Sequence, residues 1–447
     1  MSKEEQALEN DVNETMKVKK TGEKTGNRFG FFQKYPEWVI GGILGVLHSQ
    51  LVEYTYHVVP EPYMDEIFHV RQARQYCAND FSRYDPMITT PPALYFLTML
   101  LSFPCGQERY TNSIIIPFTF VAFFRLRRQF SSSSTTLNAL TCLSVLSLPI
   151  LFHPTLLYYT DLLSLTAVIW GMSLMEPGKA AVCFSLAVFT RQTNIVWAGV
   201  YGVIRLVQTI DPNRIRLSIE EALYRLRAFI YLALLFLAFF IHNGGTVVLG
   251  DRTAHKPVPH FMQLYYMAVT IVAFGAPYLL MHGHVIRGVV AALRRPISSL
   301  FACAIIAIGV YNFTFEHPYL LADNRHFTFY IWRRWFRREW WCRYAVIPIY
   351  LFCLHIIQDS VKHLSPLLIG TSIAATAAVL VPANLIEPRY FILPYVLWRL
   401  SLKESDRLNL FLEILFNILI NTIVLYLFYE KPFKWANKPD EIQRFMW

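Results

Sequence analysis

Charged side chains are scarce in this sequence of 447 residues. Asp, Glu, Lys and Arg make up 16% of it, against 54% hydrophobic and 15% aromatic residues, and the mean hydropathy is +0.34. A soluble domain carries about 25% charged residues, so this composition argues against a soluble protein. Apolar runs recur along nearly the whole chain, which predicts an all-α polytopic membrane protein with one integral domain.

Several motifs of soluble enzymes are also missing. The chain has no phosphate-cradling P-loop, no HExxH zinc motif and no serine nucleophile elbow. It offers no soluble nucleotide-binding module long enough to bind a sugar nucleotide from the cytosol. If the protein transfers a group, its donor is therefore expected to be a lipid, with no metal or other cofactor.

Cysteine is infrequent and scattered. The seven cysteines form no CxxC pair and lie mostly within apolar segments, at positions 77, 105, 142, 183, 303, 342 and 353. This spacing predicts neither a disulfide framework nor a zinc site. We expect most of these residues to be small buried hydrophobic side chains.

The first 37 residues are polar and lack an apolar core. A secretory signal carries an apolar stretch near its start, so this segment is not one. We predict a disordered cytosolic tail at 1–37 and an integral membrane domain at 38–447, whose first span directs its own insertion.

The net charge of +10 is explained by where the basic residues lie. They cluster between apolar runs, as the positive-inside bias predicts, so topology accounts for the charge better than a nucleic-acid partner does. The clusters lie in the tail and at 125–129, 211–227, 287–295 and 399–407. Placing them in the cytosol brings the polar segments together on the other membrane face. Those segments are 60–92, 153–161, 191–194, 250–260, 316–326 and 384–390.

About 20 apolar residues cross a bilayer core, and the apolar runs predict roughly 11 to 14 transmembrane helices. The clear runs are Trp38–Val59, Leu137–Tyr158, Phe229–Leu249, Phe261–Met281, Ile297–Phe313, Leu367–Pro382 and Leu408–Tyr429. For the topology to hold, segment 93–105 must dip into the membrane or pair with the next segment as a hairpin. Segment 333–343, rich in Trp and Arg, is expected to form an amphipathic interfacial helix.

Two adjacent acids, Asp65 and Glu66, follow the first apolar run. They are typical of the first turn of a helix, where carboxylates accept hydrogen bonds from free N–H groups. The same position suits a general base, because it is partly desolvated yet open to a soluble acceptor sugar. If a helix starts here, His69 shares a face with Asp65. Asp85 lies in a proline-rich run, which predicts either a rigid connector or a stiff frame for a carboxylate.

A second polar segment lies between apolar flanks further along the chain. Its candidate site residues are Glu316, His317, Asp323, Asn324, Arg325 and His326. This density predicts anion recognition, since Arg binds phosphate through a planar fork and His adds a donor. Arg191 and Arg389 each adjoin an apolar segment and are either structural charges or functional ones. Acids near one span end and bases near others predict a phosphate-bearing substrate drawn from the membrane.

The chain resembles the α-1,2-glucosyltransferases of the endoplasmic reticulum that use dolichyl-phosphate glucose. The resemblance runs from about residue 38 to the C-terminus. It is carried by the segments EPYMDEIFHVRQARQYC, YDPMITTPPALY, FTRQTNIVWA, NGGTVVLGDR, HPYLLADNRHFTFYIWRR, EPRYFILPY and DEIQRFMW. It implies a GT-C fold in the endoplasmic-reticulum membrane, with a lumenal active site. The implied partners are dolichyl-phosphate glucose, the lipid-linked oligosaccharide Glc2Man9GlcNAc2-diphosphodolichol as acceptor, and membrane lipids.

The resemblance also implies a mechanism and leaves other functions open. The acceptor's 2-hydroxyl would attack the donor with inversion, and Asp65 or Glu66 would act as the base. Arg325, His326 and Arg389 would stabilise the leaving phosphate. A sister mannosyltransferase or α-1,3-glucosyltransferase would share the fold and the acids. A transporter or lipid flippase would explain the spans, but the chain lacks the repeated halves that such a protein favours.

Overall fold

The computed structural model describes residues 35–252 and 256–447, so nearly all of the predicted tail lies outside the described residues. Helices dominate, and the first half of the chain forms α3 (Pro36–Val58), α4 (Glu66–Cys77), α5 (Ala93–Leu101), α6 (Tyr110–Phe130), α7 (Thr135–Leu146), α8 (Pro149–Thr155), α9 (Asp161–Ser173), α10 (Pro177–Thr190), α11 (Ile195–Thr209), α12 (Ile215–Arg225) and α13 (Arg227–His242), with the 3-10 turn η1 (Gln192–Asn194).

The second half continues with α14 (Met262–Phe274), α15 (Ala276–Met281), α16 (His284–Leu293), α17 (Pro296–Phe313), α18 (Pro318–Ala322), α19 (Phe327–Ile331), η2 (Trp332–Phe336), α20 (Cys342–Ala345), α21 (Ile347–Val361), α22 (Pro366–Leu380), η3 (Pro388–Phe391), α23 (Ile392–Ser401) and α24 (Arg407–Glu430). Two short strands, β1 (Phe433–Trp435) and β2 (Lys438–Gln443), pair antiparallel near the C-terminus. The mostly helical structure, with its long apolar helices, confirms an all-α polytopic membrane protein.

Three helical segments in the described residues are long and apolar enough to cross a bilayer, and two bent helix pairs raise the number to five. The segments are α17, Cys342–Val361 and α24, and the bent pairs are α7 with α8 and α12 with α13. Five further apolar helices are shorter, at 10–17 residues. Helices below about 17 residues reach across only by tilting or by thinning the bilayer, so the count of 11 to 14 spans stays a prediction.

Two apolar runs that look continuous in the sequence are broken in the structure. The run Leu137–Tyr158 bends by 71° between α7 and α8. Leu148 precedes Pro149 and takes an extended ψ of 123°, as a residue before proline must when the ring excludes the helical region. The run Phe261–Met281 divides at Gly275 into α14 and α15.

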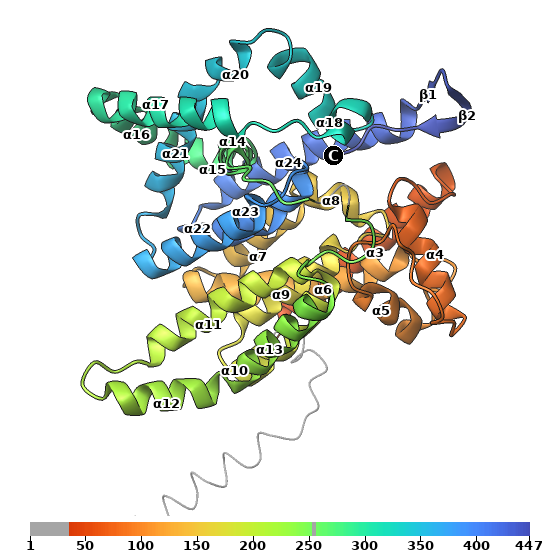
Figure 1. The fold of residues 1–447 in the computed structure, drawn as a ribbon, viewed down its shortest axis with the longest axis horizontal. Coiled ribbons are helices and arrows are strands. Elements are labelled where there is room, and N and C mark those ends of the chain that lie inside the picture. The colour runs from red at the N-terminus through yellow and green to blue at the C-terminus, as the bar shows by residue number, and fades with distance from the viewer. Residues whose placement is uncertain (1–34, 253–255) are drawn as a thin grey trace, which may run out of the picture.

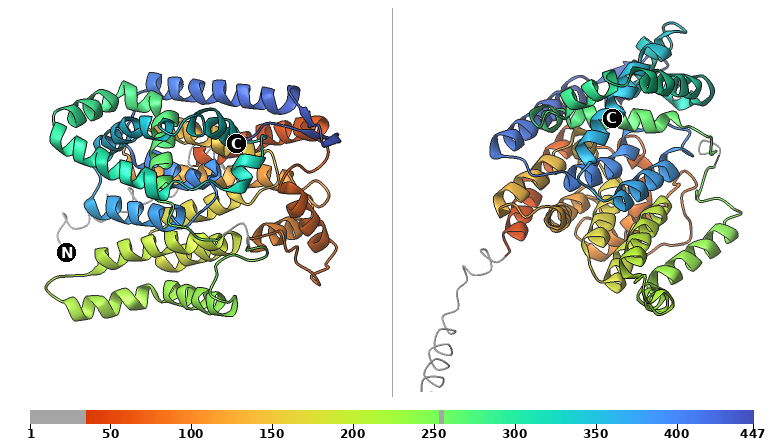
Figure 2. Two further views of the ribbon diagram at one scale, coloured as in Figure 1. Left: turned by 45° about the horizontal axis from the view of Figure 1, so that its top comes forward. Right: turned by 90° about the vertical axis from the view of Figure 1, so that its left-hand side faces the viewer.

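The predicted polar segments gather at one end of the molecule, here called the polar end and formed by 60–92, 153–161, 191–194, 250–252, 256–260, 316–326 and 384–390. Gln192 Nε2 donates to the Thr89 carbonyl at 2.9 Å, and the Asp251 N–H donates to the Pro86 carbonyl at 2.7 Å. Helices α4 and α5 and the β1–β2 hairpin lie at this end, whereas the α11–α12 and α16–α17 connections lie at the other (Figures 1 and 2).

The opposite end, here called the basic end, carries the clusters 125–129, 211–227, 287–295 and 399–407. Arg127 Nη1 donates to the Leu400 carbonyl at 2.9 Å, and Ser131 bonds to Glu404 at 3.0 Å. Clusters far apart in the sequence therefore meet there. The largest group of buried apolar side chains joins α6, α7 and α9 to α23, so both halves of the chain share this core.

The segment 93–105 holds a helix too short to cross a bilayer core. Helix α5 has nine residues and packs against α4, and the following loop returns to α6 at the polar end. A disulfide joins Cys77 at the end of α4 to Cys105 in that loop, with the Cα atoms 6.0 Å apart. The spacing predicted no disulfide framework, and this one bridge was therefore missed. The partners are 28 residues apart, and the packing of α5 and the loop after it against α4 brings them together.

The arginine- and tryptophan-rich segment 333–343 is not one continuous helix. It begins within the π-helical turn η2 and ends in the short helix α20. Trp340 is 77% exposed, and Arg337 and Arg343 both pair with Glu316. The predicted interfacial helix is wrong in its secondary structure, because these ion pairs fold the segment back on the chain before it.

Candidate active site

The loop between α3 and α4 turns sharply just before the two acids. Met64 lies in the left-handed region with φ of 58°, and the carbonyls of Tyr63 and Met64 accept from the first N–H groups of α4. Asp65 is the residue that precedes α4, and its side chain makes no capping hydrogen bond. The backbone alone therefore forms the helix start at Asp65, and its carboxylate remains available for another role.

Glu66 performs the structural task expected of the acidic pair. Its carboxylate accepts from the Tyr63 N–H at 2.9 Å and the Tyr158 N–H at 2.8 Å. Arg109, at the start of α6, holds the same carboxylate with two bonds of 2.7 Å. Both side chains are at most 1% exposed. With four donors on a fully buried carboxylate, Glu66 fixes the loop, α4 and α6 together.

Asp65 points toward a different cation. Its Oδ2 lies 3.3 Å from Nη2 of Arg389, and the Asp65 side chain is 55% exposed while that of Arg389 is 9% exposed. Arg389 lies in η3, more than 300 positions later in the chain. The first polar loop and the last polar segment therefore meet at one ion pair, with the acid facing solvent and the arginine buried behind it.

Arg389 is shared among three carboxylates. Besides Asp65, it contacts Glu387 closely, and its Nη1 lies 3.6 Å from Oδ2 of Asp161. Its guanidinium lies over the Tyr159 ring, 4.7 Å from the centroid. Such a planar cation with several donors can also bind phosphate oxygens. It can therefore exchange a carboxylate for a phosphate without moving from its place on the ring.

Arg191 extends this network. Its Nη2 lies 2.9 Å from Oδ1 of Asp161, and its Nε donates to the Thr160 hydroxyl at 2.9 Å. Asp161 thus bridges the two arginines. Arg191 is 22% exposed, so one edge of its guanidinium faces outward beside Arg389.

His69 lies one helical turn after Asp65. Its Nδ1 lies 2.6 Å from the Tyr95 hydroxyl, and its ring packs edge-on against Tyr159. Burial lowers the pKa of His69 to about 4, so the imidazole is neutral near pH 7. Partial desolvation by itself would raise the pKa of Asp65, but the charge of Arg389 outweighs this effect and leaves that pKa below its ordinary 3.8. Asp65 is therefore ionised and His69 neutral in the resting site.

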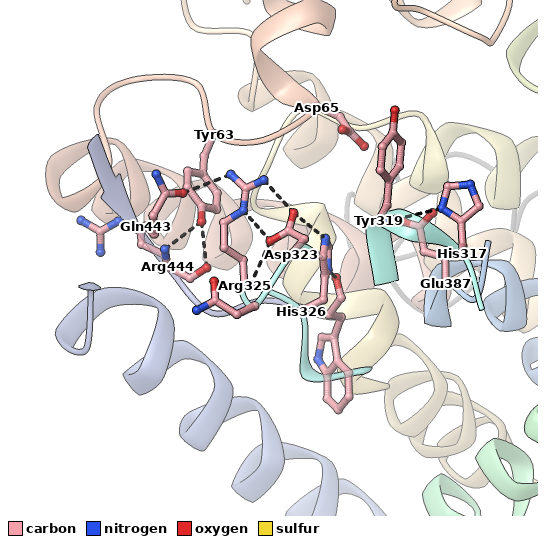
Figure 3. Close-up of polar contacts among 12 residues, drawn as sticks. Tyr63, Asp65, His317, Tyr319, Asp323, Arg325, His326, Glu387, Gln443 and Arg444 are labelled. Carbon is pink, nitrogen blue, oxygen red and sulfur yellow. Dashed lines mark hydrogen bonds and ion pairs between the residues drawn. The ribbon is translucent and has the colours of Figure 1, made fainter. Parts of the chain in front are cut away.

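A second polar cluster adjoins Asp65 (Figure 3). Arg325 binds Asp323 through bonds of 2.8 and 2.7 Å and reaches Gln443 of β2 at 3.1 Å. His326 Nε2 lies 3.9 Å from Asp323. His326 is among the groups that lower the pKa of Asp65, so the cluster lies near the acid.

The C-terminal segment holds this second cluster against the first loop. The Tyr63 hydroxyl donates to the Arg444 carbonyl at 2.8 Å and accepts from its N–H at 2.7 Å. The Met446 N–H donates to the Arg325 carbonyl at 2.9 Å. Residues 444–446 therefore connect the loop that carries Asp65 to the loop that carries Arg325.

Four other predicted site residues have mainly structural contacts. Asp85 accepts from the Met87 N–H at 2.9 Å, as in a tight turn, and lies 3.7 Å from Arg71. Glu316 pairs with arginines of 333–343. His317 accepts from the Tyr319 N–H at the start of α18, and Asn324 accepts from the Trp435 indole at 2.7 Å. These residues shape the loops around the two clusters.

Sequence reasoning missed Asp161 and Glu387. Both lie in segments assigned to the polar end, but each resembles a structural acid: Asp161 opens a helix and Glu387 precedes a proline. The position of Glu387 two residues before Arg389 was an available signal, whereas Asp161 is far from both arginines in the sequence. In residues 35–252 and 256–447, no group of His, Cys, Asp and Glu has a metal-binding arrangement.

Comparison with known proteins identifies relatives of this chain. The sequence profile of the DIE2/ALG10 family matches residues 59–227 and 213–400. A Homo sapiens protein named Dol-P-Glc:Glc(2)Man(9)GlcNAc(2)-PP-Dol alpha-1,2-glucosyltransferase is 32% identical over 443 residues, which cover 87% of this chain and 93% of the relative. Proteins of the same name from Mus musculus (32% over 444 residues, 87% and 93% covered) and Arabidopsis thaliana (31% over 493 residues, 88% and 96% covered) are similarly related.

No solved structure matches the chain. The family profile spans more than half of the sequence, and the relatives align over nearly their full length, so the resemblance seen in the motifs is confirmed. The chain belongs to the DIE2/ALG10 family.

Proposed function

We propose that this protein is a hexosyltransferase that moves glucose from dolichyl-phosphate glucose to the lipid-linked oligosaccharide Glc2Man9GlcNAc2-diphosphodolichol, forming the terminal α-1,2 linkage. Homologues from animals and plants are named for this reaction. The observation that carries the proposal is the contact between Asp65 and Arg389 at the polar end. It places an ionised, exposed acid beside a buried arginine, which is the pair that base catalysis and a phosphate leaving group require.

In the proposed step, the acceptor's 2-hydroxyl attacks the anomeric carbon of the donor from the face opposite the phosphate. Asp65 takes the hydroxyl proton as the new C–O bond forms. The bond from the anomeric carbon to the phosphate oxygen breaks, and dolichyl phosphate leaves with both electrons. Phosphate leaves without protonation, so one base is enough and the configuration inverts from β to α.

Arg389 connects the two halves of this step. The donor is a phosphodiester with one negative charge, and the product phosphate carries two. As Asp65 gains a proton, it becomes neutral and its ion pair with Arg389 is lost. At the same time the phosphate gains a negative charge. The total charge of the site is unchanged, and negative charge moves from Asp65 to the phosphate. Arg389 is placed to pair first with Asp65 and then with the phosphate. A preorganised donor of this kind stabilises a transition state by about 2.7–4 kcal/mol.

We assign the remaining residues by their contacts. Arg191 supports Arg389 through Asp161, and His69 supplies a neutral hydrogen-bonding group beside the base. Arg325 contributes positive charge from the second cluster, and His326 contributes a hydrogen-bonding imidazole. Glu66 is a positioning residue, since its carboxylate is saturated by Arg109 and two backbone N–H groups.

Two independent features support a lumenal site in a GT-C fold. Disulfides persist in the oxidising lumen of the endoplasmic reticulum and are rare in the cytosol, and Cys77–Cys105 lies at the polar end. The basic clusters gather at the other end, where the positive-inside bias expects the cytosol. Both features support a polar end that faces the lumen.

The test is to replace Asp65 with Asn in the purified full-length protein and to measure transfer from dolichyl-phosphate glucose to the defined oligosaccharide acceptor. We expect kcat to fall by about 10²–10⁴-fold, while the thermal unfolding midpoint stays unchanged. Activity near that of the wild type would remove Asp65 from the base role. A wild type that transfers mannose from dolichyl-phosphate mannose and not glucose would instead identify a sister mannosyltransferase.

A further inference from the structure

A cavity of about 310 Å³ lies beside the second cluster and has no part in the proposed step. It lies between α18–α19 and the β1–β2 hairpin. Small-molecule pockets begin at about 300 Å³, so this volume is large enough for a ligand. The side chains that define its chemistry are Leu321, Asn324, Phe329, Arg333, Trp435 and Asn437.

The polar groups of this cavity are held in place by other contacts. The Trp435 indole N–H donates to Asn324 Oδ1 at 2.7 Å, which leaves the two N–H donors of the Asn324 amide for another partner. Arg325 lies over the Trp435 ring, 4.9 Å from its centroid. Arg333 lies over the Phe329 ring at 5.6 Å. The cavity therefore presents a fixed indole and oriented donors without any ligand.

This composition suits a neutral ligand rich in hydroxyl groups. Within the described part of the chain, the cavity lining contains no carboxylate, so it does not suit a cation. It has a single guanidinium beside two primary amides, whereas a phosphate site favours several cationic groups. A primary amide both donates and accepts, as a sugar hydroxyl does. The apolar rings of Phe329 and Trp435 supply surfaces against which the C–H face of a sugar can pack.

We propose that this cavity binds sugars of the acceptor oligosaccharide other than the glucose that receives the transfer. The inference rests on the proposed function, because it takes the lipid-linked oligosaccharide as the acceptor. Arg325 links the cavity to the active centre, since it stacks on Trp435 and also binds Asp323. A second contact on the glycan would orient its terminal arm toward Asp65. Such binding acts equally on the ground state and the transition state, so it lowers the acceptor KM without changing kcat.

The decisive variants are Asn437→Ala and Trp435→Ala, with Lys434→Ala as the matched control. Asn437 is exposed in the hairpin turn, so its removal leaves the fold intact. Lys434 precedes Trp435 on β1, is also exposed, and does not line the cavity. We expect the acceptor KM to rise about tenfold in Trp435→Ala and about threefold or more in Asn437→Ala. The donor KM and kcat of Asn437→Ala should stay within about twofold, and the control should match the wild type.

An unchanged acceptor KM in both cavity variants would overturn the inference, as would an equal rise in the donor KM. Binding separates this inference from the proposed function. The released oligosaccharide, titrated without donor against the wild type and Asn437→Ala, should bind the variant about threefold or more weakly. Equal affinities would refute the cavity site even if transfer proceeds. A wild type that binds the glycan but transfers no glucose would refute the proposed function and leave the cavity site standing.

Discussion

Replacing Glu66 with Gln should destabilise the protein rather than remove a chemical group. In the wild type the Glu66 carboxylate accepts two bonds from Arg109 and one N–H each from Tyr63 and Tyr158. A glutamine keeps one acceptor oxygen and places an NH2 group against donors that need an acceptor. Arg109, 1% exposed, would then be buried without a neutralising charge.

The magnitude follows from these contacts. Hydrogen bonds to charged groups contribute about 1.5–3 kcal/mol each, and the substitution removes the equivalent of two. Breaking a buried ion pair by removing one partner typically costs about 3–5 kcal/mol. We therefore expect Glu66→Gln to lower the free energy of unfolding by about 3–5 kcal/mol. Asp65→Asn, at an exposed acid with a shared partner, should cost less than about 1 kcal/mol.

The measurement is the unfolding midpoint of the detergent-solubilised variants, with glucose transfer assayed well below that midpoint. A Glu66→Gln, Arg109→Gln double variant is the control, because its loss should be smaller than the sum of the two single losses by about 0.5–3 kcal/mol. The folded fraction of Glu66→Gln should retain most of the activity. A variant with wild-type stability and no transfer would show that Glu66 acts in the chemistry and would refute this reasoning.

Two further predictions concern the same end of the molecule. Arg389→Gln should lower kcat by about 10²–10³-fold and shift the acid limb of the kcat/KM profile to higher pH. In the wild type, Asp65 has a pKa below 3.8 and stays ionised as the pH falls. Without the cation, the partial desolvation of this carboxyl group raises its pKa, and activity is lost at a higher pH. An unmoved acid limb would contradict the pairing. Replacing Cys77 and Cys105 together with Ser should lower the free energy of unfolding by about 3–4 kcal/mol, as expected for a 28-residue loop. Denaturant titration of the oxidised protein measures this change, and unaltered stability would argue against the cross-link.

The arrangement of the two ends was largely predictable from the sequence. Basic clusters and polar segments alternate along the chain, and a chain that crosses a bilayer repeatedly must sort them to opposite faces. The contact between Asp65 and Arg389, and that between Arg191 and Asp161, join segments assigned to one face in advance. Apolar composition likewise predicts membrane helices without ambiguity, because few other structures bury so many apolar residues.

Features that depend on distance in three dimensions were not predictable. The Cys77–Cys105 bridge needs α5 and the loop after it to pack against α4, and no spacing rule reports that packing. The bend at Pro149 divides a run whose hydropathy is continuous, since hydropathy records solvent preference and not backbone direction. Asp161 was overlooked because an acid at a helix start has a sufficient structural explanation until a cation is seen beside it.

The two adjacent acids illustrate why local sequence could not separate their roles. Successive residues of a helix point about 100° apart, so neighbours of the same chemistry can face wholly different surroundings. Glu66 turns inward to Arg109 at the start of α6, and Asp65 turns outward to Arg389 of η3. Exchanging their directions would bury the acid that must meet the acceptor and would expose the one that fixes the loop. The buried pair therefore has a functional consequence without taking part in the reaction: by fixing the rotation of α4, it determines where the neighbouring carboxylate points.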